Sequence, residues 1–139
     1  MGLIRALSAS ASGLAAQRVR MDVISSNVAN VETTTTADGG PYQRQVVRFA
    51  SGESTLPFAS VISRFAGGAD TGVVLTQVGV DEETPGRSVY EDGFVEMPNV
   101  DMVQEMTDLT SANRSYQANV TVLNAVKQMA LRALDISSR

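Results

Sequence analysis

Apolar residues recur at alternating steps of four and three near both ends of the chain. Near the amino terminus these steps select eight positions, six of them apolar: Leu3, Leu7, Ser10, Leu14, Gln17, Met21, Ile24 and Val28. Near the carboxyl terminus they select ten positions, eight of them apolar: Met102, Met106, Leu109, Asn113, Tyr116, Val120, Leu123, Lys127, Ala130 and Leu134. This spacing is typical of a coiled-coil seam. The sequence therefore predicts two long helices that bury these seams.

Turn-forming residues set the limits of both helices. The first is predicted over residues 3–30, because a β-branched run at 33–36 and a glycine and proline turn at 37–41 follow it. The second is predicted over residues 100–137, a stretch without glycine or proline, with Asn99 or Asp101 as its amino-terminal cap. Between them, residues 42–49, 58–65 and 73–80 are predicted strands, with a shorter strand at 88–90.

These elements predict a mainly α fold with three segments. Residues 1–30 form the N-terminal helix, residues 31–97 a small β-rich or irregular middle segment, and residues 98–139 the C-terminal helix. The two helices are expected to form one antiparallel coiled-coil domain, because the middle segment starts where one ends and stops where the other begins. Both chain termini then lie at the far end of the pair.

The second helix carries more apolar surface than one partner helix covers. A second row runs beside its seam: Val122, Val126, Met129, Ala133 and Ile136. We hypothesise that the helix ends are mobile in a free monomer and become ordered when neighbouring subunits bury this row. The alternative is a compact bundle in which the middle segment covers the row, but the low apolar bulk of that segment disfavours it.

Composition excludes most enzyme classes. The 139 residues include no Cys and no His, which rules out disulfides, thiol catalysis, cysteine metal sites and a histidine general base. Chemistry based on carboxylates alone remains open, and we expect no cofactor, metal or small-molecule substrate. The net charge is -4, with no cluster of Lys and Arg of the kind that binds nucleic acid. No apolar run approaches the ~20 residues of a membrane-spanning helix, and no cleavable signal is expected.

The charge is unevenly distributed along the chain. Residues 81–108 hold nine acids and one base, whereas residues 109–139 hold four bases and one acid. The acidic segment lacks the ligand spacing of a calcium loop, so a solvated surface is its simplest interpretation. A sharper hypothesis is that it faces arginine-bearing surfaces of adjacent subunits. Replacing Glu82 and Glu83 by Lys is then expected to impair assembly.

Two long signatures resemble those of a known family. Residues 10–30 contain Arg20-Met-Asp-Val-Ile-Ser-Ser-Asn-Val-Ala-Asn30, which resembles the N-terminal signature of bacterial flagellar axial proteins, and the run from Gly39 to Arg44 is also similar. Residues 97–100 and 114–119 resemble the C-terminal signature of the family. The chain departs from the family pattern between Val89 and Val95, where a longer loop with His and Pro is usual, so contacts of that loop do not transfer.

The resemblance implies a non-enzymatic structural subunit of the flagellar rod, the shaft that crosses the periplasm and transmits torque. It implies export through the flagellar type III apparatus, helical assembly with itself and with other proximal and distal rod proteins, and contact with FliE, the adaptor to the export gate and MS ring. A carboxylate-dependent cell-wall hydrolase and a soluble coiled-coil adaptor are the competing interpretations. The candidate interface residues are Leu3, Leu7, Leu14, Met21, Ile24, Asn27, Val28, Asn30, Met102, Met106, Leu109, Arg114, Tyr116, Val120, Leu123, Met129 and Leu134.

Several candidates also have simpler interpretations. Asn27 and Asn30 are suited to capping the end of the first helix as well as to an interface. Arg114 and Tyr116 are expected to pack centrally on the second helix, with the tyrosine ring buried. Asn113 and Lys127 are polar seam positions that either fix the register of the helices or touch water at the seam edge.

Overall fold

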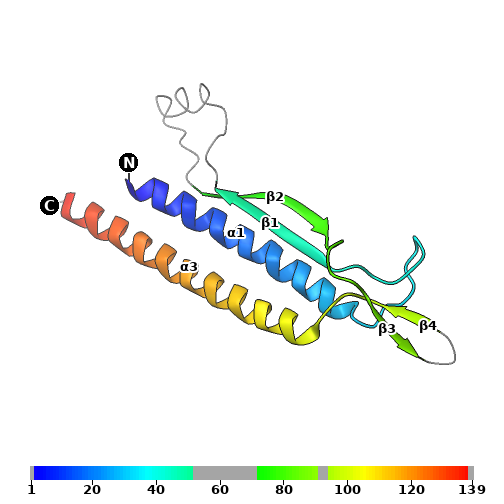
Figure 1. Ribbon diagram of the computed structural model, residues 1–139. Coiled ribbons are helices and arrows are strands. Elements are labelled where there is room, and N and C mark those ends of the chain that lie inside the picture. Colours follow the sequence, from blue (N-terminus) through cyan, green and yellow to red (C-terminus); the bar gives the residue numbers. More distant parts are fainter. Residues whose placement is uncertain (1, 52–71, 91–93, 138–139) are drawn as a thin grey trace, which may run out of the picture.

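The described part of the chain folds into two long helices and two β-hairpins. The structure, a computed structural model, describes residues 2–51, 72–90 and 94–137. The elements in order are α1 (Gly2–Ala29), β1 (Gln45–Ser51), β2 (Val73–Val80), β3 (Arg87–Tyr90), β4 (Phe94–Met97) and α3 (Met102–Ser137). In Figure 1, α1 and α3 run side by side in opposite directions, and the two chain termini lie at the same end. The predicted antiparallel helix pair and mainly α fold are therefore confirmed.

The strands agree with the sequence only in part. β2 coincides with the strand predicted over residues 73–80, and β1 starts three residues later than the predicted 42. Residues 58–65 lie outside the described residues. β4 was not predicted; it pairs antiparallel with β3, and Val89 and Val95 are partners in the register.

Two contacts fix the register of the helix pair. The Asn27 Nδ2 donates a hydrogen bond to the Glu105 Oε2 at 3.1 Å. Further along, a Cβ added to Gly13 would lie 3.0 Å from the Asn119 Nδ2, so glycine allows the two backbones to come close at this point. Gly13 lies as far before Asn27 as Asn119 lies after Glu105, so both contacts belong to one antiparallel register.

The observed seam of α3 differs from the predicted seam at every second position, where the residue one place earlier in the sequence faces α1. The residues that are buried or half-buried along the face toward α1 are Glu105, Leu109, Ala112, Tyr116, Asn119, Leu123, Val126 and Ala130. The prediction that Met106, Asn113 and Lys127 occupy this seam is wrong, because these side chains are exposed, as are Met102 and Leu134 nearer the helix ends. Val120 is half-buried beside the seam.

Small and polar side chains explain this difference. Ala112 is 1% exposed and Ala16 of α1 is 7% exposed, so small residues occupy tightly packed positions on both helices. Counting apolar residues favours the bulkier row of α3, whereas the fold places the row with the smaller side chains against α1. Met106 of the predicted row is exposed, whereas Tyr116 and Leu123, which belong to both rows, face α1.

The β1–β2 hairpin lies along α1 on the side away from α3 (Figure 1). One end is attached where Asn27 bonds the backbone of Gln45, and the other where the Val73 N–H donates to the Ser12 Oγ at 3.0 Å. Helix residues 12–27 span about 22 Å, close to the roughly 23 Å of a seven-residue strand. α1 is thus covered from two sides, whereas among the described elements α3 packs against α1 alone.

The hydrophobic core is small. The buried apolar residues of the described part are Ala16, Ile24, Ala112 and Val126. None of the described helices combines the length and apolar character needed to cross a membrane.

Candidate assembly interface

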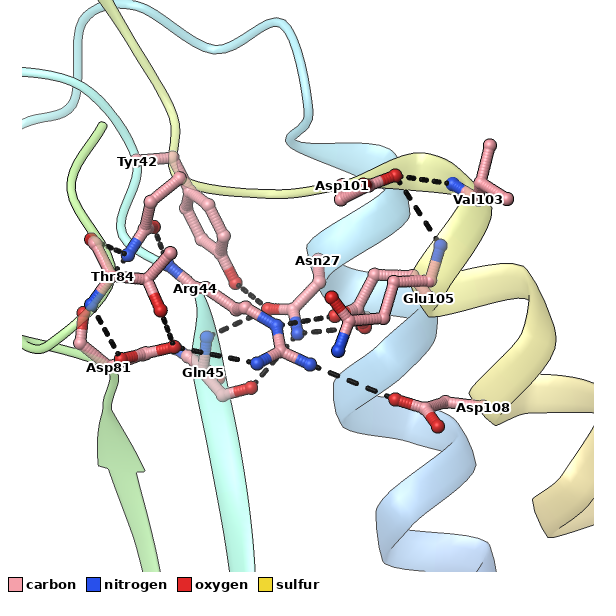
Figure 2. Close-up of polar contacts among 12 residues, drawn as sticks. Asn27, Tyr42, Arg44, Gln45, Asp81, Thr84, Asp101, Val103, Glu105 and Asp108 are labelled. Carbon is pink, nitrogen blue, oxygen red and sulfur yellow. Dashed lines mark hydrogen bonds and ion pairs between the residues drawn. The ribbon is translucent and has the colours of Figure 1, made fainter. Parts of the chain in front are cut away.

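Asn27 joins three elements at the end where α1 stops and α3 starts. Its side chain is 1% exposed. Its Nδ2 donates to the Gln45 carbonyl oxygen at 2.9 Å and to Glu105, while its Oδ1 accepts from the Gln45 N–H at 2.9 Å and from the Tyr42 hydroxyl at 3.0 Å. Both donors and both lone pairs of the amide are used, so this buried polar group is fully satisfied. Toward the Gln45 backbone, Asn27 both donates and accepts a hydrogen bond, as the backbone of a neighbouring strand would (Figure 2).

Arg44 lies among three carboxylates in the same region. Its Nε donates to the Glu105 Oε1, and its terminal nitrogens lie 3.4 Å from Asp81 and 3.8 Å from Asp108 (Figure 2). The Glu105 side chain is only 1% exposed, so removing this arginine would leave a buried carboxylate without its ion-pair partner. Burial lowers the pKa of Arg44, but the hydrogen bonds and charges of Glu105 and Asp81 outweigh burial and raise the pKa above its usual value. We call Asn27, Arg44, Asp81, Asn99 and Glu105 the polar junction.

Asp81 organises the loop that follows β2. Its carboxylate accepts hydrogen bonds from the Thr84 hydroxyl at 2.8 Å and from the backbone N–H groups of Thr84 and Glu83. The hydroxyl of Thr84, then these N–H groups and Arg44, hold the pKa of Asp81 below its usual value, although partial desolvation opposes them. The aspartate is therefore kept as an anion at neutral pH.

Asn99 closes the open end of the β1–β2 hairpin. Its Oδ1 accepts from the Arg44 N–H at 2.7 Å, and its Nδ2 donates to the carbonyl oxygens of Asp81 and Thr84, each at 3.0 Å. The Asn99 side chain thus links the backbone of Arg44 to the backbone of Asp81 and Thr84, beyond the ends of the paired strands. Asp101 is the cap of α3, since its Oδ1 accepts from the Val103 N–H at 2.9 Å, which decides between the two predicted caps.

The polar junction has the chemistry of a structural anchor. Arg44 pairs with its three carboxylates, and a lowered pKa on Asp81 is the opposite of what a general acid at neutral pH requires. Among the described residues no group of three or more acidic side chains is arranged to hold a metal ion.

Away from this junction, the outer face of α3 is open. Large apolar side chains that are between 45% and 78% exposed gather toward its two ends, within residues 102–106 and 122–136: Met102, Val103, Met106, Val122, Met129, Leu131, Leu134 and Ile136. Residues 129–136 bring four of these side chains close together, and large exposed apolar patches usually mark binding sites. The outer face of α3, defined by these residues, is the candidate assembly interface.

The candidate residues from the sequence fall into three groups. Ile24 and Asn27 are buried. The half-buried ones are Leu7, Leu14, Met21, Val28, Asn30, Leu109, Tyr116, Val120 and Leu123. The exposed ones are Met102, Met106, Arg114, Met129 and Leu134. The side chain of Leu3 lies outside the described residues, and the role of each candidate in contacts between subunits stays a prediction.

Within the chain, Asn30 caps the end of α1, which is the simpler of the two roles predicted for it. Its Nδ2 donates to the Ser26 carbonyl oxygen at 2.9 Å, and its own N–H also reaches that carbonyl, so it caps the last turn of α1. Asn27, three residues earlier, instead reaches sideways to β1 and α3.

Comparison with known proteins identifies the family. One family model, described as flagella basal body rod protein, matches residues 7–35, and another, described as flagellar basal body rod FlgEFG protein C-terminal, matches residues 91–136. The flagellar basal-body rod protein FlgC of Bacillus subtilis is 41% identical to this chain, with 98% of this chain and 99% of that protein covered. The chain belongs to the FlgC family of flagellar basal-body rod proteins.

Other bacteria carry similar relatives. FlgC of Borreliella burgdorferi is 40% identical and FlgC of Salmonella typhimurium 38% identical, each with 98% of both chains covered. Membership of the FlgC family makes this chain a structural rod subunit of the flagellar basal body. The two regions that the family models match contain most of α1 and nearly all of α3.

Proposed function

We propose that this chain polymerises helically, with itself and with related rod proteins, into the proximal part of the shaft that transmits torque. The observation that carries the proposal is the open apolar face of α3, where Met129 is 54% exposed and Leu134 is 67% exposed. Burying one such side chain stabilises a contact by roughly 1.5 to 3 kcal/mol. Burial of several such side chains by a neighbouring subunit therefore gives enough binding free energy to hold the subunits in a stiff assembly.

The contacts between subunits are heterologous. The outer face of α3 and the hairpin along α1 are different surfaces on different sides of the molecule (Figure 1). A contact between two unlike surfaces does not close on itself after one pairing, so it propagates into a ring or a helix. Helical growth suits a shaft, and the expected partners are other rod subunits and the adaptor FliE.

Export without a cleavable signal, through the flagellar type III apparatus, completes the proposal. A channel that passes unfolded chains favours proteins that unfold easily. The chain has no Cys that could form a disulfide, and the buried apolar residues of its described part are few and small. These features are compatible with such a route.

We also propose that the chain is not an enzyme. The carboxylates of the polar junction serve as partners of Arg44, and the lowered pKa of Asp81 removes it as a proton donor near neutral pH. A cell-wall zymogram with the purified protein tests this point, and a cleared band that disappears in the Glu105→Gln variant would support hydrolysis instead.

Complementation tests the main proposal. A strain that lacks its own copy is given this chain, and basal bodies are purified and probed for it. The proposal predicts that the chain is found in the rod and restores swimming. If swimming returns while purified basal bodies lack the chain, the structural role is wrong.

A further inference from the structure

The helix α3 extends past the start of α1. Asn27 faces Glu105 and Gly13 faces Asn119, and continuing this register places Gly2, the first residue of α1, opposite Ala130. Residues 131–137 of α3 therefore have no α1 residue beside them, and they extend about 10 Å beyond it. Figure 1 shows this end of α3 running past the start of α1. We call residues 131–137 the overhang.

The overhang is apolar along much of its surface. Leu131 is 54% exposed, Leu134 is 67% exposed and Ile136 is 78% exposed. It also carries an exposed base, Arg132, for which the described residues provide no ion pair. The carboxylate in the overhang, Asp135, already has an interaction of its own.

The opposite end of the molecule contains a hollow of complementary character. It has a volume of about 210 Å³ and lies between the end of α1, the end of β4 and the start of α3. Its lining consists of Val31, Glu32, Met97, Pro98, Val100 and Met102. A neighbouring hollow shares Val31, Pro98, Val100 and Met102 and is also lined by Asp101. Apolar walls offer water few hydrogen-bond partners, so aliphatic side chains are the occupants that such a hollow favours.

Charge complementarity links the two ends. Glu32 lines the hollow and is exposed, without an ion pair among the described residues. Asp101 lines the neighbouring hollow, whereas the overhang carries one base, Arg132, and one acid, Asp135. Glu32 at the rim of the hollow and Arg132 on the overhang are therefore opposite charges that an end-to-end approach of two such molecules brings together.

We propose that the hollow receives the apolar last turns of a C-terminal helix from an adjacent rod subunit, with a base of that helix paired to Glu32. This inference rests on the proposed function, because it presupposes that the chain is built into the rod. It adds the partner segment and the residues that receive it. The overhang of this chain is the same kind of segment and docks into the corresponding hollow of the next subunit.

Photocrosslinking in living cells tests the contact. Glu32, at the rim of the hollow, is replaced by p-benzoylphenylalanine, cells are irradiated, and basal bodies are purified for mass spectrometry of the adducts. The proposal predicts an adduct to the last turns of a C-terminal helix of a rod subunit. The same replacement at Thr35, an exposed residue that does not line the hollow, is predicted to give no such adduct. An adduct of the Glu32 position to any other segment, or none, overturns the proposal.

A charge placed in the hollow gives a second readout. Val31→Asp buries a carboxylate against apolar side chains on docking, which should lower the amount of the chain in purified basal bodies at least about ten-fold. Thr35→Asp, with the same charge outside the hollow, should leave that amount unchanged. Circular dichroism checks that both purified variants keep their helix content. Equal incorporation of the two variants counts against the proposal.

The two failures are distinguishable. If the unmodified chain is absent from purified basal bodies, the proposed function itself is wrong. If the chain is present but the Glu32 position crosslinks elsewhere, only the docking of the helix end is wrong.

Discussion

At the end where α1 stops and α3 starts, Asn27 and Glu105 are each 1% exposed, whereas at the other end Leu134 and Ile136 are 67% and 78% exposed. The first end is held by hydrogen bonds and ion pairs that join both helices and the hairpin within one chain. The second end consists of a helix that extends past its partner. The difference indicates that the chain completes one end by itself and leaves the other to its neighbours. Four predictions test this contrast.

The largest effect is expected at the outer face of α3. Leu134→Asp should abolish incorporation into the rod while sparing export, because a charge on that face cannot be buried against a neighbour. The free energy of unfolding of the free chain should change by no more than about 0.5 kcal/mol, as is usual for exposed positions. Basal-body content and urea denaturation measure the two quantities. Leu123→Asp, at a half-buried seam position, should lower both. Normal swimming of the Leu134→Asp variant would remove the assembly role of this face.

The next effect is expected in the polar junction. Glu105→Ala removes the buried partner of Arg44 and Asn27, so the free chain should lose about 3 to 5 kcal/mol of its free energy of unfolding. Gln104→Ala, at the exposed neighbouring position, is the control and should change it by less than about 0.5 kcal/mol. Urea denaturation followed by circular dichroism measures both. Similar midpoints for the two variants would mean that the junction does not hold this end together.

A smaller difference is expected between Asn27 of α1 and Asn30, which follows the end of that helix. Asn27→Ala leaves the backbone groups of Gln45 without their partner and should cost about 2 to 3 kcal/mol, while Asn30→Ala removes one C-cap and should cost about 1 kcal/mol or less. Equilibrium unfolding of the two variants gives the ordering. If Asn30 proves the more important, capping outweighs the link between helix and hairpin.

The smallest effect concerns pH. Because the pKa of Asp81 is lower in the folded chain than in the unfolded one, its contribution to stability is present above the unfolded pKa of about 3.9 and is lost as the pH falls through the folded pKa. Thr84→Val removes the hydroxyl that contributes most, so the pKa of Asp81 should move up toward its usual value. Carboxyl NMR titration of both proteins measures the shift. An unchanged pKa in the variant would rule out the Thr84 hydroxyl as its main cause.

The sequence predicted the helices well and the polar junction poorly. Periodicity located α1 and α3, because each is a long amphipathic run between strong turn signals. The Arg44 and Glu105 pair could not be predicted, since 61 residues separate the two and no local pattern links them. Asn27 was predicted as an interface or capping residue near the end of α1. Its partners Gln45 and Tyr42 could not be predicted, because they become its neighbours only when the hairpin folds along α1.

The α3 seam was predicted in part for a physical reason. Leu109, Tyr116 and Leu123 face α1 as expected, because they belong to both possible apolar rows. Between them the fold prefers Ala112 and Asn119 to the bulkier side chains beside them, since close approach at Gly13 demands small or polar groups. Apolar counts measure how strongly a row prefers burial, and they do not tell which partner buries it.

Hydrogen exchange tests most directly whether the far end of the helix pair needs neighbours. Peptides from residues 122–137 are compared between the dilute free chain and isolated basal bodies, with residues 105–112 as the internal reference. The account predicts rapid exchange of residues 122–137 in the free chain and strong protection in the basal body, while residues 105–112 are protected in both. Equal protection of residues 122–137 in the two states, independent of concentration, would contradict it.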